Sequence, residues 1–295
     1  MRFRAVLTDN AAMKIFLSTV TGLSKISKEC VMRILPRNLY FIIPNDDTGP
    51  RRPLVWCKLP IHFYFREFNC EGVSEEHNEI YLNFATTMLV RSLSSIKQNA
   101  KSLKIKLTNK HTPCLTLEIE QAVNEGLQTR QVVHDIPVEV ILRQNWDEYA
   151  EPIFNNFHVS IEMPNLRTIK NIVERMKNMS NLLTVSATKN GRLTLQIKTN
   201  VVRVSAYFSN LGIQSFSIGT HDDDIDDTEP PGDTITSSES VSATIDSKKF
   251  LMFLTAIQLN RCQTTCSIVQ GKMVKLTSTQ PDTFSVQCFF TEMSI

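Results

Sequence analysis

The order of structural elements that the sequence predicts occurs twice along the chain, at a period of roughly 150 residues. Alternating apolar positions predict a strand at residues 3–8, and a helical pattern follows at 10–28. The second copy opens with a strand at 158–163 and a helix at 164–180. In both copies a hairpin, further strands, a second helix, a second hairpin and a last strand follow. The repeat predicts an α+β fold with two similar domains, each with two helices packed on antiparallel sheet.

The length agrees with this division, because 295 residues is a usual length for two domains. We place an N-terminal domain at residues 1–143, an interdomain connector at 144–156 and a C-terminal domain at 157–295. The second helix of the C-terminal domain, Phe250–Leu259, is apolar nearly all round and is predicted to lie in the core.

The formal net charge of +2 conceals an uneven distribution of charge. Seven acids and no Lys or Arg lie between Asp222 and Asp233. Without them, 32 bases face the other 23 of the 30 acids, which leaves the rest of the chain at +9. A basic body fits a polyanionic partner, with an ordinary solvated surface as the alternative. The acidic insert, at about 219–237, is poor in apolar residues and is predicted to be a disordered loop.

Three predicted helices carry cations on the face opposite their apolar side chains. A surface that binds DNA phosphates without reading sequence needs cations and small donors of this kind. The alternative is that these are solvated faces rich in lysine, and Glu174 on the third helix has the wrong sign for phosphate. The candidate DNA-facing residues are Lys14, Lys25 and Lys28 on the first helix, Arg91 on the second, and Lys170 and Lys177 on the third.

We searched the sequence for catalytic and metal-binding patterns and expect an enzyme site, a metal and a cofactor to be absent. Cys262 and Cys266 have no neighbouring histidine or further cysteine to complete a zinc site. His134 and Asp135 are adjacent on a predicted strand, so their side chains point to opposite faces. A metal-dependent DNA-processing enzyme remains an alternative, and its carboxylates would come from residues 222–227.

Several features bear on the cellular compartment. The start of the chain lacks the apolar core of a signal peptide, and no apolar run approaches the ~20 residues that a membrane span needs. The seven cysteines are odd in number and irregular in spacing, which favours reduced thiols in the cytosol or nucleus. We therefore expect no association with a membrane.

An ordered series of segments covering nearly the whole chain resembles the Hus-type subunit of the checkpoint nine-one-one clamp, in the PCNA-like sliding-clamp family. None of the segments is diagnostic alone, but their order is highly specific. The segments are Met1–Ala5, Glu71–Ser74, Asn78–Leu82, Leu103–His111, Val133–Pro137, Val173–Asn178 and Gly191–Leu195.

The resemblance implies a non-enzymatic subunit of a heterotrimeric ring that encircles double-stranded DNA regardless of its sequence. Two other clamp subunits would complete the ring through strand edges, and helices would line the hole, which places the six cations above toward the duplex. A clamp loader, checkpoint proteins and repair proteins are the further partners implied. The expected location is the nucleus, with some cytoplasmic pool and import together with a partner subunit.

Clamp partners usually dock near the interdomain connector. By analogy, the residues that could contribute to a partner pocket are Phe41, Ile43, Val140, Leu142 and Phe289. The alternative for each is a place in the sheet core, and the closing segment 286–291 resembles that of the family only loosely. A self-assembling, replication-type processivity clamp is an alternative function within the same fold.

Overall fold

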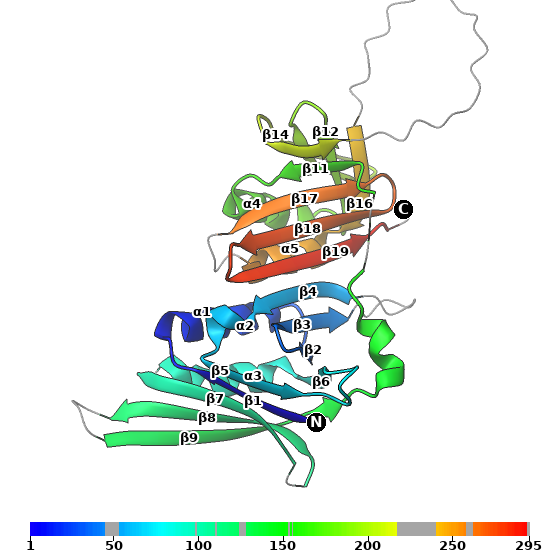
Figure 1. Ribbon diagram of the computed structural model, residues 1–295. Coiled ribbons are helices and arrows are strands. Elements are labelled where there is room, and N and C mark those ends of the chain that lie inside the picture. The colour runs from blue at the N-terminus through cyan, green and yellow to red at the C-terminus, as the bar shows by residue number, and fades with distance from the viewer. Residues whose placement is uncertain are drawn as a thin grey trace, which may run out of the picture. The chain divides into compact units, whose positions relative to one another are not determined.

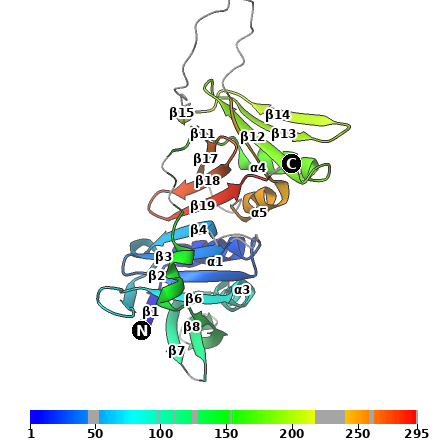
Figure 2. The same cartoon turned by 90° about the vertical axis from the view of Figure 1, so that its right-hand side faces the viewer.

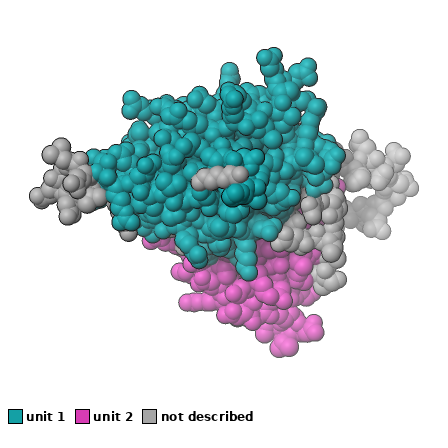
Figure 3. All heavy atoms as spheres, turned by 90° about the horizontal axis from the view of Figure 1, so that it is seen from below, with its two compact units in different colours: residues 1–153, 252–262, 278–289 teal, residues 154–251, 263–277, 290–295 magenta. Residues whose placement is uncertain are grey.

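The computed structural model describes residues 1–44, 53–97, 99–109, 111–123, 128–152, 154, 156–216, 240–257 and 262–293. The acidic insert expected at about 219–237 lies outside these described residues. The chain forms two compact units, coloured separately in Figure 3. The first unit comprises residues 1–153, 252–262 and 278–289, and the second comprises 154–251, 263–277 and 290–295. The domain boundaries given above stay a prediction.

The first unit contains a five-stranded antiparallel sheet in the order β5-β1-β7-β8-β9 (Figure 1). These strands are β1 (Arg2–Leu7), β5 (Glu67–Glu71), β7 (Ala100–Asn109), β8 (Pro113–Val123) and β9 (Gln128–Pro137). A second antiparallel array in this unit has the order β10-β6-β2-β3-β4-β19. Its strands are β2 (Glu29–Ile34), β3 (Asn38–Pro44), β4 (Pro53–Pro60), β6 (Ile80–Ala85), β10 (Glu139–Val140) and β19 (Phe284–Thr291), of which the last two residues group with the second unit.

The second unit contains a four-stranded antiparallel sheet in the order β14-β13-β12-β16, and Figure 2 shows β12, β13 and β14 side by side. Its strands are β12 (Leu182–Thr188), β13 (Leu193–Lys198), β14 (Arg203–Phe208) and β16 (Ser240–Asp246). A further array in the order β18-β17-β11-β15 lies in the same unit. Its strands are β11 (Val159–Glu162), β15 (Ile213–Phe216), β17 (Gln263–Val269) and β18 (Met273–Gln280), of which the last three residues group with the first unit.

The helices of the first unit are α1 (Asn10–Leu23), α2 (Ile61–Tyr64) and α3 (Thr86–Leu93), and α3 continues into a 3-10 segment, η1 (Ser94–Lys97). The N-cap of α1 is Asp9, whose Oδ1 accepts the backbone N–H of Ala12 at 2.7 Å. The helix predicted at 10–28 therefore starts where expected, but its predicted end at Lys28 is wrong, because α1 ends at Leu23.

The core of the first unit forms where α1 packs onto the sheet through Phe16. The Phe16 ring lies 6.0 Å from that of Phe41 on β3 and 6.1 Å from that of Tyr64 on α2, measured between ring centroids. All three side chains are fully buried. Aromatic rings at such edge-on and tilted distances add to the stability that burial of their area supplies.

The remaining helices are α4 (Leu166–Lys177), in the second unit, and α5 (Ser247–Ile257), whose residues from 252 onward group with the first unit. Asn165 caps α4 by accepting the N–H of Arg167 at 2.9 Å, so this helix starts two residues later than predicted from Pro164. On α5 the side chain of Phe250 is buried against Phe290, with ring centroids 5.4 Å apart, which agrees with the core position predicted for this helix. No helix in the described part of the chain is long and apolar enough to cross a membrane.

Candidate nucleic-acid interface

Lys14 lies on the outward face of α1. Taking Phe16 as the buried direction, Lys14 is turned away from it by roughly 160°, at 100° per residue. It is exposed, whereas Ala12, Phe16 and Val20 are buried. Leu17, near the edge of the polar stripe, is also buried, because α3 and η1 pack beside α1 in addition to the sheet.

Lys25 and Lys28 follow α1 rather than belonging to it. The helix ends in a turn in which the N–H of Lys25 donates to the carbonyl of Gly22 at 3.0 Å. The Ser24 hydroxyl donates to the Thr21 carbonyl at 2.8 Å and so competes with continued helix at this end. Both lysines are nevertheless exposed, Lys25 in the turn and Lys28 just before β2.

Arg91 is exposed on α3, the helix that packs against α1. Neither α1 nor α3 contains an acidic residue. The first unit therefore brings Lys14 and Arg91 onto two adjacent helices whose own sequences supply no compensating negative charge. Exposed cations of this kind can contact phosphates, and such contacts do not depend on base sequence.

In the second unit the two predicted cations of α4 are less available. Lys170 and Lys177 are half-buried, and Lys170 forms an ion pair with Glu174 at 3.5 Å. Their directions explain this, since both lie roughly 80–100° from the buried direction defined by Ile169.

Arg167 lies on the outward face of α4: it is exposed and is turned roughly 160° away from the buried Ile169. Sequence reasoning did not select Arg167, although the spacing of the buried Ile169, Val173 and Met176 identifies it. Met179 is 54% exposed, because it lies beyond the end of α4 at Lys177.

The residues proposed for a partner pocket lie in different environments. Phe41, Ile43 and Phe289 are buried, and the ring of Phe41 lies on the side of the sheet that contacts α1. These three side chains are core in this structure, as the alternative interpretation has it. Val140 is half-buried and Leu142 is 63% exposed, directly before the connector.

The connector contains a 3-10 helix, η2 (Arg143–Tyr149), whose Trp146 anchors it to the first unit. The Trp146 ring stacks on that of Tyr81 at 4.7 Å and 25°, and its Nε1–H donates to the carbonyl of Ile141 at 3.0 Å. Sequence reasoning missed this contact. The sequence feature that could have revealed it is Trp146, a large apolar residue inside a segment predicted only as a connector.

Beside this contact, the guanidinium of Arg33 lies between two tyrosine rings, 5.7 Å from Tyr40 and 5.3 Å from Tyr81. Arg33 also forms an ion pair with Glu79 at 2.7 Å. Burial raises the pKa of the Tyr40 and Tyr81 hydroxyls, against the opposing effect of the Arg33 charge. The tyrosines therefore stay neutral, and Tyr81 of this cluster stacks on Trp146 of the connector.

In each unit, a terminal strand carries an exposed apolar side chain. β9 is the last strand of the five-stranded sheet and β14 the last strand of the four-stranded sheet. Val133 on β9 is 51% exposed and Tyr207 on β14 is 63% exposed. An edge strand presents backbone N–H and C=O groups that can pair with another chain. By contrast, the β16 edge is covered by backbone hydrogen bonds from Gly271 and Met293.

In the ranges that the structure describes, no three His, Cys, Asp or Glu side chains gather in a way that could hold a metal ion. The acids that the enzyme alternative would use, residues 222–227, lie outside those ranges. Cys30, Cys57, Cys70, Cys114 and Cys266 are free thiols.

Comparison with known proteins identifies the family. The family model described as "Hus1-like protein" matches residues 1–294. The chain belongs to this family. It is 39% identical to the human checkpoint protein HUS1 over 295 residues, which cover 100% of both chains, and 29% identical to the Drosophila melanogaster checkpoint protein Hus1-like, with 94% of this chain and 93% of the relative covered.

The Hus1-like chain also has the fold of the sliding clamps. The crystal structure of the proliferating cellular nuclear antigen from Entamoeba histolytica superposes with a TM-score of 0.67 over 99% of both chains, at 14% sequence identity. The resemblance stated from the sequence and the α+β clamp fold are thus confirmed. Family and fold together support a clamp subunit of the DNA-damage checkpoint as its function.

Proposed function

We propose that this Hus1-like chain is a non-enzymatic subunit of a heterotrimeric ring that encircles double-stranded DNA and recruits checkpoint and repair proteins. The observation that carries the proposal is the match of the whole chain to the Hus1-like family on a sliding-clamp fold. Two other clamp subunits complete the ring, and a clamp loader places it on DNA. The nucleus is the proposed location, with some cytoplasmic pool.

The strand edges β9 and β14 support assembly with other subunits. Each is a terminal strand with an exposed apolar side chain, Val133 or Tyr207, and the two belong to different units. A subunit with two unlike edges joins its neighbours head to tail, and such contacts close into a ring when the rotation is right. Backbone pairing along an edge gives affinity, and the side chains at the edge give the choice of partner.

The cations of the first unit support the contact with DNA. Lys14, Lys25, Lys28 and Arg91 are exposed on α1, the turn after it, and α3. Long flexible cations that neutralise phosphates bind any duplex sequence. A ring that moves along DNA needs contacts of this kind, because base-specific hydrogen bonds would hold it at one site.

Light scattering tests the assembly. We expect the purified chain to be a monomer and to form a 1:1:1 complex with two partner clamp subunits. Because lysine on a strand edge opposes pairing, Val133→Lys and Tyr207→Lys should each weaken one boundary of the ring. Val73→Lys is the matched control, since Val73 is similarly exposed, at 54%, but lies outside the strands.

Two outcomes would contradict the proposal. A stable trimer of this chain alone would favour the replication-type processivity clamp. A chain that neither self-assembles nor joins clamp subunits would remove the ring model and reopen the enzyme alternative, which nuclease assays with magnesium or manganese would then decide.

A further inference from the structure

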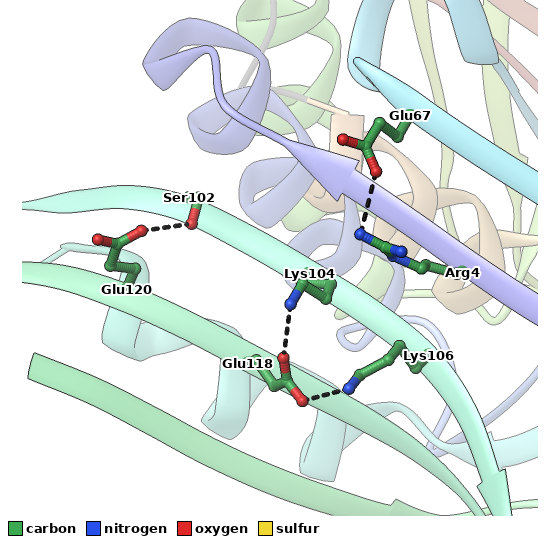
Figure 4. Close-up of polar contacts among 7 residues, drawn as sticks. All are labelled: Arg4, Glu67, Ser102, Lys104, Lys106, Glu118 and Glu120. Atoms are coloured by element: carbon green, nitrogen blue, oxygen red, sulfur yellow. Dashed lines mark hydrogen bonds and ion pairs between the residues drawn. The ribbon is translucent and has the colours of Figure 1, made fainter.

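The outer face of the five-stranded sheet carries charged side chains. On β1 the alternation of a strand buries Phe3, Ala5 and Leu7 and turns Arg2 and Arg4 to the other face. The pairing of β1 with β7 places Arg4 directly opposite Lys106. Figure 4 shows Arg4 and Lys106 on these neighbouring strands.

Arg2, Arg4 and Lys106 line one hollow of about 240 Å³ at this face. Asn69 and Glu71 of β5 line it too, so a side-chain amide and one carboxylate accompany the three cations. Three positive groups and one negative group around a single hollow favour a compact anion.

Two of these cations can turn toward a ligand at small cost. The Nη1 of Arg2 lies 3.8 Å from the Glu71 carboxylate, and the two side chains are 85% and 70% exposed, so this ion pair contributes little. Lys106 contacts Glu118, but Lys104 binds the other oxygen of that carboxylate at 3.0 Å (Figure 4). Glu118 therefore keeps a partner when Lys106 moves.

Arg4 supplies the fixed part of the hollow. One terminal nitrogen, Nη2, binds the Glu67 carboxylate at 3.1 Å, which orients the guanidinium (Figure 4). A guanidinium has five N–H donors in a planar fork, so this one bond occupies only part of its capacity. Arginine with a neighbouring cation is the usual arrangement for binding a phosphorylated side chain.

We propose that this hollow binds a phosphorylated serine or threonine on a segment of a partner protein. A compact dianion concentrates its charge within the hollow that the three cations line. A long polyanion such as DNA would instead run past Glu67, Glu71 and Glu118, which lie between and beside the cations. The site is on a different sheet face from the cationic helices, and its test needs only the isolated chain.

Fluorescence anisotropy with the full chain tests the proposal. The probe is a fluorescently labelled peptide, Gly-Ala-phosphoserine-Ala-Gly. It is compared with the same peptide carrying serine or aspartate at its centre, and with a DNA duplex that carries the same label. Arg4→Gln and Lys106→Gln should each weaken phosphopeptide binding about tenfold, the loss expected for one charge-assisted hydrogen bond at an exposed site. Lys101→Gln is the matched control, an exposed lysine of the same strand that does not line the hollow.

The site would be supported if the chain binds the phosphopeptide, both variants weaken that binding and the control variant leaves it intact. Inorganic phosphate should compete with the phosphopeptide. Equal binding of the serine peptide, or duplex DNA as the only anion sensitive to Arg4 and Lys106, would overturn it. Thermal unfolding identifies any variant that loses the fold, and the other variant then decides. Because ring assembly is not involved, failure here leaves the clamp proposal standing.

Discussion

Removing two exposed cations from the first unit should reduce the salt dependence of DNA binding by a calculable amount. Each phosphate contact contributes about 0.9 to the slope of log K against log salt concentration. Lys25 and Arg91 are exposed beside helices without acidic residues, so each is counted as one contact. Lys25→Gln combined with Arg91→Gln should therefore lower the slope by about 1.8. Between 50 and 200 mM salt, that difference amounts to about tenfold in affinity.

The assay is equilibrium binding of the assembled three-subunit ring to a labelled linear duplex across this salt range. Lys170→Gln in the second unit is the internal comparison, because Lys170 is only 23% exposed and already pairs with Glu174. Its effect on the slope should be less than half that of one exposed cation. An unchanged slope in the double variant, with the ring still assembled, would refute the reasoning that α1 and α3 face the duplex.

Three further perturbations test the packing and the electrostatics. Leu93→Ala on the buried face of α3 should cost about 2–5 kcal/mol in the free energy of unfolding, and a denaturant titration will contradict the packing if the loss is below this range. The neighbouring Lys106 and Lys104 lower the pKa of Glu118 in the folded protein. Its ionised form therefore stabilises the fold fully above the unfolded-state pKa of about 4.3, and this stabilisation is lost as the pH falls through the lower pKa of the folded state. Glu118→Gln should thus lower the melting temperature at pH 7, with the difference from the native chain shrinking in acid. Burial raises the pKa of Cys57 and Cys266 to about 12, so iodoacetamide at pH 8 should label them only after denaturation, as mass spectrometry would detect.

The elements with strong local signals agree between sequence and structure. The first hairpin predicted in the second copy is present as β12 and β13. Gly191 has a φ of +71°, and a Cβ there would lie 2.5 Å from the carbonyl oxygen of Leu211. The residue that marks the turn in the sequence is thus also the one that the backbone requires.

Other elements lack a local signal of that strength. No glycine or proline separates Leu23 from Lys28, so the helical pattern continues past the true end of α1. α2 spans four residues and β15 spans four, which is too short for a periodic pattern to identify, and neither was predicted.

The candidate site was predictable in part. Exposure of Lys14 and Arg91 follows from the spacing of apolar residues on their own helices. The burial of Phe41 and Ile43 does not, because a strand covered on both faces shows no alternation from which the inner face can be chosen. The hollow beside Arg4 was not predictable either, because it depends on the register in which β1 pairs with β7.

The pairing of β19 with β4 has a consequence for how the protein is made. Residues 285–288 lie opposite residues 55–58, within the first unit. Domains usually complete their folding in order as they leave the ribosome. Here β4 has no strand partner on one side until residues near 288 have been synthesised. During most of translation the first unit therefore exposes an unpaired strand edge. Cells that produce this subunit should therefore depend on chaperones acting during synthesis, and a ribosome stalled after residue 277 should hold a first unit open to aggregation or proteolysis.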